Sequence, residues 1–78
     1  MVDLKSILAN IAKSIVDRPE DVTVSETIEN NDIVLELSVA PDDMGKVIGR
    51  RGRIARAIRM VMKSAASTVD KKVIVKIK

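Results

Sequence analysis

The chain contains no phenylalanine, tyrosine, tryptophan, cysteine or histidine among its 78 residues. Without aromatic rings it cannot read bases by stacking, which excludes RNA recognition in the manner of RRM or cold-shock modules. Without cysteine it has no disulfide framework, and we expect a cytoplasmic protein. Because histidine is missing as well, we expect no transition-metal site and no cofactor.

Long apolar runs and, in one region, acidic residues are also missing. No apolar run approaches the ~20 residues of a membrane span, so we expect no membrane association. Residues 1–43 carry ten acidic and three basic side chains, whereas residues 44–78 carry eleven basic and one acidic. Between Met44 and Val69 there is no Asp or Glu. Such a one-sided field attracts polyanions, although a charge run alone also fits a solvated basic helix.

The N-terminal half shows the patterns of one helix and one hairpin. Apolar residues at helical spacing predict a helix that Asp3 caps and that ends before Pro19. The runs 22–28 and 33–39 are rich in β-branched or alternating apolar residues, and turn-forming residues at 29–32 separate them. These three segments predict a β-hairpin.

The C-terminal half predicts two helices and a last strand. Residues 41–43 (PDD) open a short helix, and we interpret their carboxylates as helix caps rather than metal ligands. A longer helix is expected over residues 53–67, and a strand over 73–77. The predicted buried face of the longer helix consists of Ile54, Ile58, Val61 and Ala65. The order α-β-β-α-α-β predicts an α+β fold.

The segment GRRG lies between the two C-terminal helices. Gly49 fits a left-handed cap at the end of the first helix. Gly52 is unfavourable at the start of the next helix, so we interpret it as a point where a ligand backbone approaches closely. Loop amides and a helix N-terminus suit a phosphate, and Arg50 and Arg51 would neutralise its charge.

In this context the segment GKVIGRRGRIARAIR, residues 45–59, resembles a KH domain. The resemblance covers strand, helix, GxxG loop, helix and strand over residues 33–77. A helix and strand before that core, within residues 1–30, is similar to the type II arrangement, a three-stranded mixed sheet packed against three helices. The whole chain, residues 1–78, therefore resembles a single KH domain of the small bacterial KhpA-like family.

The resemblance implies that the chain clamps about four nucleotides of single-stranded RNA with the GxxG loop. It implies an apolar groove wall formed by Val47, Ile48, Ile54, Ala55 and Ile58, of which Ile54 and Ile58 also fit the core. It implies base contacts along the free strand edge at Val73, Ile74 and Val75. For phosphate contacts we rank Arg50 and Arg51 first, Lys46 and Arg53 second, and Lys71, Lys72, Lys76 and Lys78 as the opposite rim. Arg56, Arg59 and Lys63 are expected to point to solvent and raise only the general field.

The resemblance also implies a homodimer, and pairing with a larger KH-containing bacterial protein. Ala57, Met60 and Ser64 form a candidate dimer surface along one flank of the longer helix. The expected role is post-transcriptional regulation or RNA chaperoning, without enzymatic activity. A DNA-binding helix-turn-helix and a protein-interaction module remain alternatives, and the discrimination between RNA and single-stranded DNA stays open.

Overall fold

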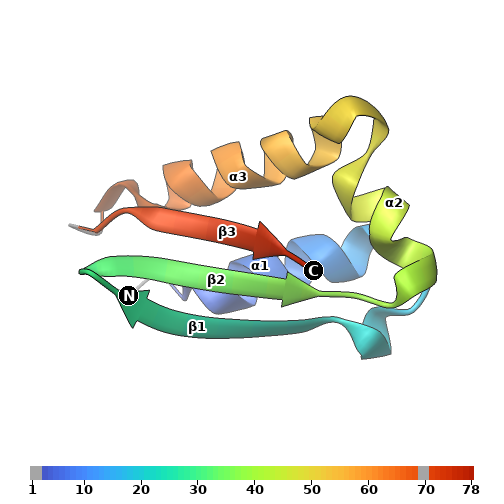
Figure 1. The fold of residues 1–78 in the computed structure, drawn as a ribbon, viewed down its shortest axis with the longest axis horizontal. Coiled ribbons are helices and arrows are strands. Elements are labelled where there is room, and N and C mark those ends of the chain that lie inside the picture. Colours follow the sequence, from blue (N-terminus) through green and yellow to red (C-terminus); the bar gives the residue numbers. More distant parts are fainter. Residues whose placement is uncertain (1–2, 69–70) are drawn as a thin grey trace.

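The secondary structure follows the expected order α-β-β-α-α-β (Figure 1). The computed structural model describes residues 3–68 and 71–78. Its elements are α1 (Leu4–Ile15), β1 (Thr23–Glu29), β2 (Asp32–Ser38), α2 (Met44–Ile48), α3 (Arg53–Ala65) and β3 (Val73–Ile77). Single turns of 3-10 helix cover Pro19–Asp21, Pro41–Asp43, Arg50–Gly52 and Ala66–Thr68.

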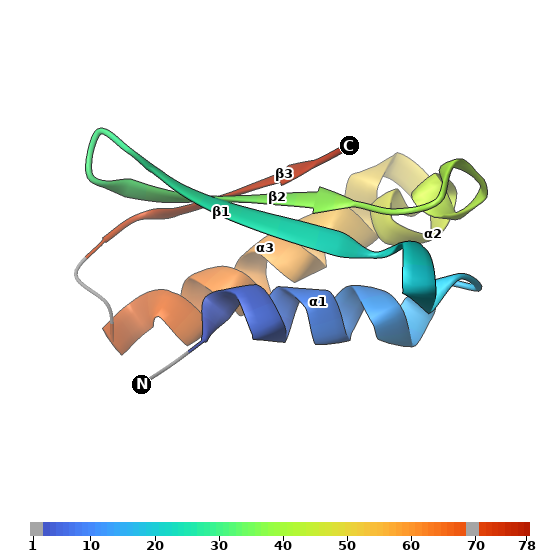
Figure 2. The same cartoon turned by 90° about the horizontal axis from the view of Figure 1, so that it is seen from below.

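The three strands form one mixed sheet in the order β1-β2-β3. β1 and β2 are antiparallel, whereas β2 and β3 are parallel. α1 packs against β1 and β2, and α3 packs against β3. Figure 2 shows both helices on the same face of the sheet, and no other described element covers the opposite face. This is the α+β architecture of a type II KH domain. Within the described residues, no helix combines the length and apolar character that a membrane crossing needs.

The central strand β2 supplies much of the core. Ile33, Leu35 and Leu37 alternate toward the helices and are buried, as their spacing predicts. Leu8 of α1 and Met62 of α3 meet them from the helical layer and are fully buried. The two long helices cover one face of the sheet only, and on the other face Val34 of β2 is buried as well.

A two-residue turn joins β1 to β2. Glu29 pairs with Asp32, and Asn30 and Asn31 between them adopt φ angles of 50° and 71°. Two consecutive positive φ angles are typical of the turn that matches the twist of a hairpin, and Asn tolerates them better than most residues. The predicted hairpin is therefore confirmed.

The two predicted helix caps differ in outcome. Asp3 caps α1 as expected, because its Oδ1 accepts the Ser6 amide at 3.2 Å. Asp43 is only 1% exposed and makes no capping bond to α2. Its carboxylate instead accepts the amides of Asp17 at 3.2 Å and Arg18 at 3.0 Å. Asp43 therefore occupies the N-cap position of α2 as expected, but its side chain does not cap that helix: it fastens the segment after α1 to the start of α2.

The buried face of α3 also differs from the prediction. Ile58 is buried as expected, but Ile54 and Val61 are 39% and 49% exposed. The buried face consists of Ala55, Ile58, Met62 and, just beyond the helix, Ala66, and the last three belong to the core cluster. The helix is therefore rotated from the predicted orientation, and this rotation changes which basic side chains lie beside β3.

Candidate nucleic-acid interface

The loop between α2 and α3 is built from positive φ angles. Gly49 ends α2 with φ 74° and ψ 173°, and its amide donates to the Gly45 carbonyl at 2.8 Å. Arg51 and Gly52 follow with φ angles of 57° and 72°. Gly49 thus has the predicted positive φ, but its ψ lies outside the left-handed helical region. Gly52 holds the left-handed conformation instead, at the N-cap of α3.

Each glycine has its own physical reason. A Cβ at Gly49 would overlap the side chain of Ile54 and would lie 3.0 Å from the Ile54 amide nitrogen. A Cβ at Gly52 would meet no atom within 4 Å, so its positive φ alone accounts for this glycine. A close ligand approach at Gly52 therefore stays a prediction that the backbone does not require.

The loop arginines are exposed, and one helical arginine supports them. Arg50 and Arg51 lie at the tip, and Arg53 begins α3. Arg56 donates from Nη2 to the Arg51 carbonyl at 2.7 Å, which holds the loop against the first turns of the helix. Within residues 3–68 and 71–78, no loop arginine forms an ion pair with an acid. Their charges are therefore available to a ligand.

Lys46, the second-ranked cation, is already paired. Its ammonium group contacts the carboxylate of Asp17 and lies 3.5 Å from that of Asp43. The hydrogen bond to Asp17 raises the pKa of Lys46. Burial by itself would raise the pKa of Asp43, but the amides of Asp17 and Arg18, with Lys46, hold it below its ordinary value. Lys46 thus serves an internal network beside the loop.

The predicted groove wall is divided between core and surface. Val47, Ala55 and Ile58 are buried, so their side chains are not available as a groove wall. Ile48, the last residue of α2, is 38% exposed, and Ile54 in the first turn of α3 is 39% exposed. An accessible apolar surface therefore remains on both sides of the GxxG loop, formed by these two isoleucines.

The strand β3 has a free edge beside α3. The Ile33 amide donates to the Lys72 carbonyl, and the Lys78 amide donates to the Leu37 carbonyl, both at 2.8 Å. In a parallel ladder alternate residues face the partner strand, so the main-chain groups of Val73 and Val75 point to the free edge. The main-chain groups of Ile74 point toward β2 instead, so the prediction that Ile74 contacts bases along the free edge is wrong.

Arg59 and Lys63 lie beside this edge. Arg59 donates from Nε to the Val75 carbonyl at 3.3 Å. A hollow of about 420 Å³ between α3 and β3 is lined by Arg59, Lys63, Lys72, Val73, Ile74 and Val75. The expectation that Arg59 simply points to solvent is therefore wrong, whereas Lys63 is exposed as expected and lines the hollow. Because α3 is rotated toward Ala55 and Met62, this basic flank lies beside the strand. The sequence does indicate the observed buried face, through the 3-4-4 spacing of Ala55, Ile58, Met62 and Ala66.

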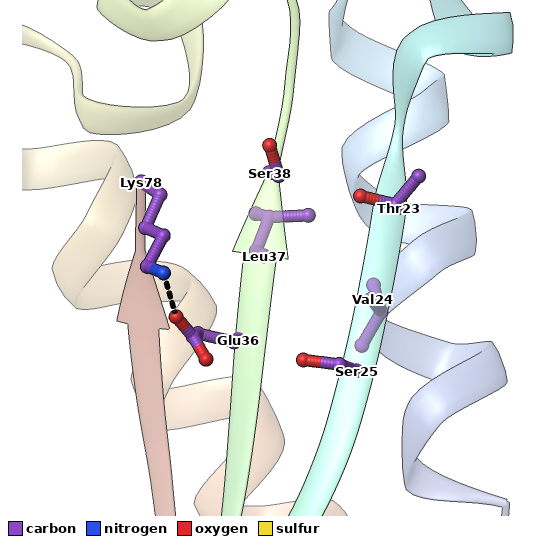
Figure 3. A pocket seen from close by; sticks show the side chains of 7 residues that line it. All are labelled: Thr23, Val24, Ser25, Glu36, Leu37, Ser38 and Lys78. Carbon is purple, nitrogen blue, oxygen red and sulfur yellow. Dashed lines mark ion pairs between the residues drawn. The ribbon is translucent and has the colours of Figure 1, made fainter.

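A second hollow lies on the helix-free face of the sheet and has a different character. It measures about 300 Å³, and its lining combines three hydroxyl side chains, two apolar ones and one ion pair (Figure 3). Lys78 Nζ lies 2.5 Å from Glu36 Oε1, and its hydrogen bond lowers the pKa of Glu36. Since the pair neutralises its own charge, this hollow offers little attraction to a phosphate. In the described part of the chain no three potential metal ligands come together.

Comparison with known proteins identifies the family of the chain. The family model described as "KhpA/KhpB, KH domain" matches residues 5–77. The chain belongs to the KhpA/KhpB KH-domain family. Among curated relatives, the RNA-binding protein KhpA of Clostridium perfringens is 57% identical over 95% of this chain and 99% of the relative. The RNA-binding protein KhpA of Chlamydia muridarum is 47% identical over 90% of each chain. This KhpA/KhpB family is one of RNA-binding KH proteins and not of enzymes.

Proposed function

We propose that the chain binds single-stranded RNA, with the sugar–phosphate backbone on the GxxG loop and the bases along the edge of β3. The curated relatives of similar length are RNA-binding proteins, which supports the class of ligand. Phosphate contacts then come from Arg50, Arg51 and Arg53, and apolar contacts from Ile48 and Ile54. The main-chain groups of Val73 and the amide of Val75 read the bases, while the Val75 carbonyl accepts from Arg59, so no aromatic side chain is needed.

One observation carries this proposal. Two exposed arginines, which pair with no acid among the described residues, lie between Gly49 and Gly52, on the side of the molecule where β3 has unpaired main-chain groups. Charge attracts the backbone, and the strand edge can distinguish an unpaired base from a paired one. A basic helix without such an edge would attract any polyanion equally.

The cellular role follows from the small binding site. A single KH unit contacts about four nucleotides, too few for strong selectivity among transcripts. We therefore propose a post-transcriptional regulator or RNA chaperone that acts on many RNAs, with selectivity increased by assembly with further KH units.

Competition between single and double strands tests the proposal. A labelled single-stranded RNA is displaced with an unlabelled single strand or with a hairpin stem of equal length. The single strand should compete far better, because a duplex hides the base edges that β3 reads. Equal competition by the stem would reject the groove and favour a helix-turn-helix mode. If the chain binds no RNA but binds a protein partner with an affinity that salt does not change, the protein-interaction module would be favoured.

A homodimer is a second proposal, and it rests on the opposite flank of α3. Met60 is 72% exposed and Val61 is 49% exposed, and Ala57 and Ser64 beside them are small enough for close helix packing. The same surface suits a larger KH-containing partner. Light scattering over a range of concentrations should show a dimer that Met60→Asp dissociates. A monomer at every concentration rejects the dimer, and a dimer that survives the substitution moves the interface elsewhere, for example to β1.

A further inference from the structure

The hollow between α3 and β3 lies outside the GxxG loop and has three cationic side chains. Arg59 and Lys63 come from α3, and Lys72 precedes β3. Within the described residues none of the three forms an ion pair with an acid. This differs from Lys46 and Lys78, whose charges are each balanced by a neighbouring carboxylate. The hollow therefore keeps an uncompensated positive charge.

Arg59 is positioned at the wall of this hollow rather than free in solvent. Its Nε–H donates to the Val75 carbonyl, which holds the guanidinium at the strand edge. A guanidinium has five N–H donors, and this bond uses one of them. The remaining donors suit a phosphate, which arginine binds in a planar, often bidentate arrangement. The same contact links the phosphate site to the main-chain edge.

The position of the hollow separates it from the loop. At 1.5 Å per residue along a helix, Arg59 lies about 10 Å and Lys63 about 16 Å from Gly52. Arg56, whose guanidinium holds the Arg51 carbonyl, lies between the loop and Arg59. A strand that leaves the loop and follows the β3 edge would therefore meet a second cluster of cations beyond its first nucleotides.

We infer that Arg59, Lys63 and Lys72 form a second phosphate-binding site, which holds the RNA backbone beyond the nucleotides gripped by the GxxG loop. This inference rests on the proposed RNA binding and extends its footprint past about four nucleotides. The ligand is a phosphodiester of the same single strand. A short oligonucleotide with its backbone on the loop reaches the β3 edge with its bases, whereas only a longer one also brings a phosphate to Lys63 and Lys72.

The test compares oligonucleotide lengths in matched variants. Single-stranded oligouridylates of four and eight nucleotides are titrated against the parent chain, against Lys63→Gln with Lys72→Gln, and against the control Lys5→Gln with Lys13→Gln on α1. Both variants carry the same net charge, and all four lysines are exposed. The ratio of parent to variant affinity at each length cancels the larger number of registers on the longer oligonucleotide. Thermal unfolding verifies that each variant folds.

The affinity of the Lys63/Lys72 variant should be about ten-fold lower than that of the parent for the eight-mer, and less than about two-fold lower for the four-mer. Its salt slope on the eight-mer should be shallower by about 1.4, at roughly 0.7 per lost phosphate contact. The control should lose little at either length. A parent-to-variant ratio that is the same at both lengths, or an equal loss in the control, overturns the second site alone. A parent that binds neither oligonucleotide overturns the proposed function as well.

Discussion

The two edges of the sheet have similar backbones and opposite charges. β1 and β3 are the outer strands, and each leaves main-chain groups unpaired on its outer side in the described structure. Beside β1 the exposed side chains include Glu26 and Glu29, whereas Lys72, Arg59 and Lys63 lie beside β3. An unpaired edge is therefore not sufficient for RNA binding. A polyanion approaches only the edge whose surrounding charge is positive.

The two turns next to these edges also share a backbone feature and differ in charge. Asn30 and Asn31 in the hairpin turn have positive φ angles, as do Gly49, Arg51 and Gly52 in the GxxG loop. The hairpin turn is flanked by acidic residues, so its exposed amides face a negative field. Backbone shape is common to both turns, and charge decides which of them suits a phosphate.

The largest expected effect comes from reversing the charge at the loop. Arg50→Asp with Arg51→Asp should weaken binding of single-stranded RNA by about 1,000-fold, roughly 4 kcal/mol, because two attractions become two repulsions. Both side chains are exposed, so the free energy of unfolding should change by less than about 0.5 kcal/mol. Fluorescence anisotropy measures binding, and denaturant unfolding measures stability.

A matched control separates the loop from net charge. Each Arg→Asp change removes two units, so the loop variant falls from the parent's net charge of +3 to −1. Lys5→Asp with Lys13→Asp reaches the same −1 on the exposed face of α1. This control should retain most of the binding. Equal losses would mean that net charge alone drives binding, and the loop would lose its special role.

The second effect concerns the shape of the loop. Gly49→Ala should destabilise the fold by about 2 kcal/mol, because the new Cβ overlaps Ile54 and the φ of 74° disfavours alanine. Gly52→Ala should cost about 1 kcal/mol, since only its left-handed φ matters there. Gly45→Ala within α2 meets no atom and should stabilise slightly. Denaturant unfolding of the three variants should give this order, and equal losses at Gly49 and Gly52 would contradict the role of Ile54.

Local patterns in the sequence were sufficient to predict the elements and the hairpin. Alternation in β2 and the two asparagines of the turn act over neighbouring residues, so they can be interpreted without tertiary structure. The resemblance at residues 45–59 added the topology, including the parallel pairing of β3, which the strand patterns alone do not determine. The GxxG loop was accordingly expected at the position where it lies.

Long-range partners could not be predicted in the same way. Asp43 bonds to amides 26 and 25 residues away, and Arg59 reaches a carbonyl 16 residues away. The apolar residues of α3 fit two overlapping stripes, one through Ile54 and Val61 and one through Ala55 and Met62. Periodicity identifies both stripes, but packing against the sheet selects one of them. The basic flank beside β3 depends on that selection.

The third effect appears only in acid and concerns the link between the segment after α1 and the start of α2. Asp43 accepts amides from the segment after α1, and these bonds with Lys46 hold its pKa below the ordinary value of about 3.9. A carboxyl group with a lowered folded pKa stabilises fully above its unfolded pKa, and loses this contribution as the pH falls through the folded value. Stability should therefore be flat near neutrality and should decline below about pH 4.

Asp43→Asn isolates this contribution. The asparagine side chain has one acceptor oxygen instead of two and carries no charge. It therefore cannot replace both hydrogen bonds to the backbone N–H groups, and the variant should unfold more easily at pH 7. Its stability should also decline less than that of the parent between pH 7 and pH 3. Asp3→Asn is the comparison, because its carboxyl also has a pKa lowered by hydrogen bonds to Ser6 but lies exposed at the start of α1. Parallel pH profiles for Asp43→Asn and the parent would remove Asp43 from the acid response.

The smallest effect is expected from making the acidic edge basic. Glu26→Lys with Glu29→Lys raises the net charge from +3 to +7, because each change adds two units. This equals the charge change of the loop variant in size, but it acts beside β1, about 10 Å across the sheet from β3. The Debye length at physiological ionic strength is about 8 Å, so much of the added field is screened at the RNA. Affinity should rise less than about three-fold at 0.15 M salt, and more at 0.01 M, where the Debye length is about 30 Å. A rise of more than about ten-fold at 0.15 M would mean that either edge can hold RNA once its charge is favourable. In that case the loop and the β3 edge would contribute only their charge, and charge alone would account for the difference between the two edges.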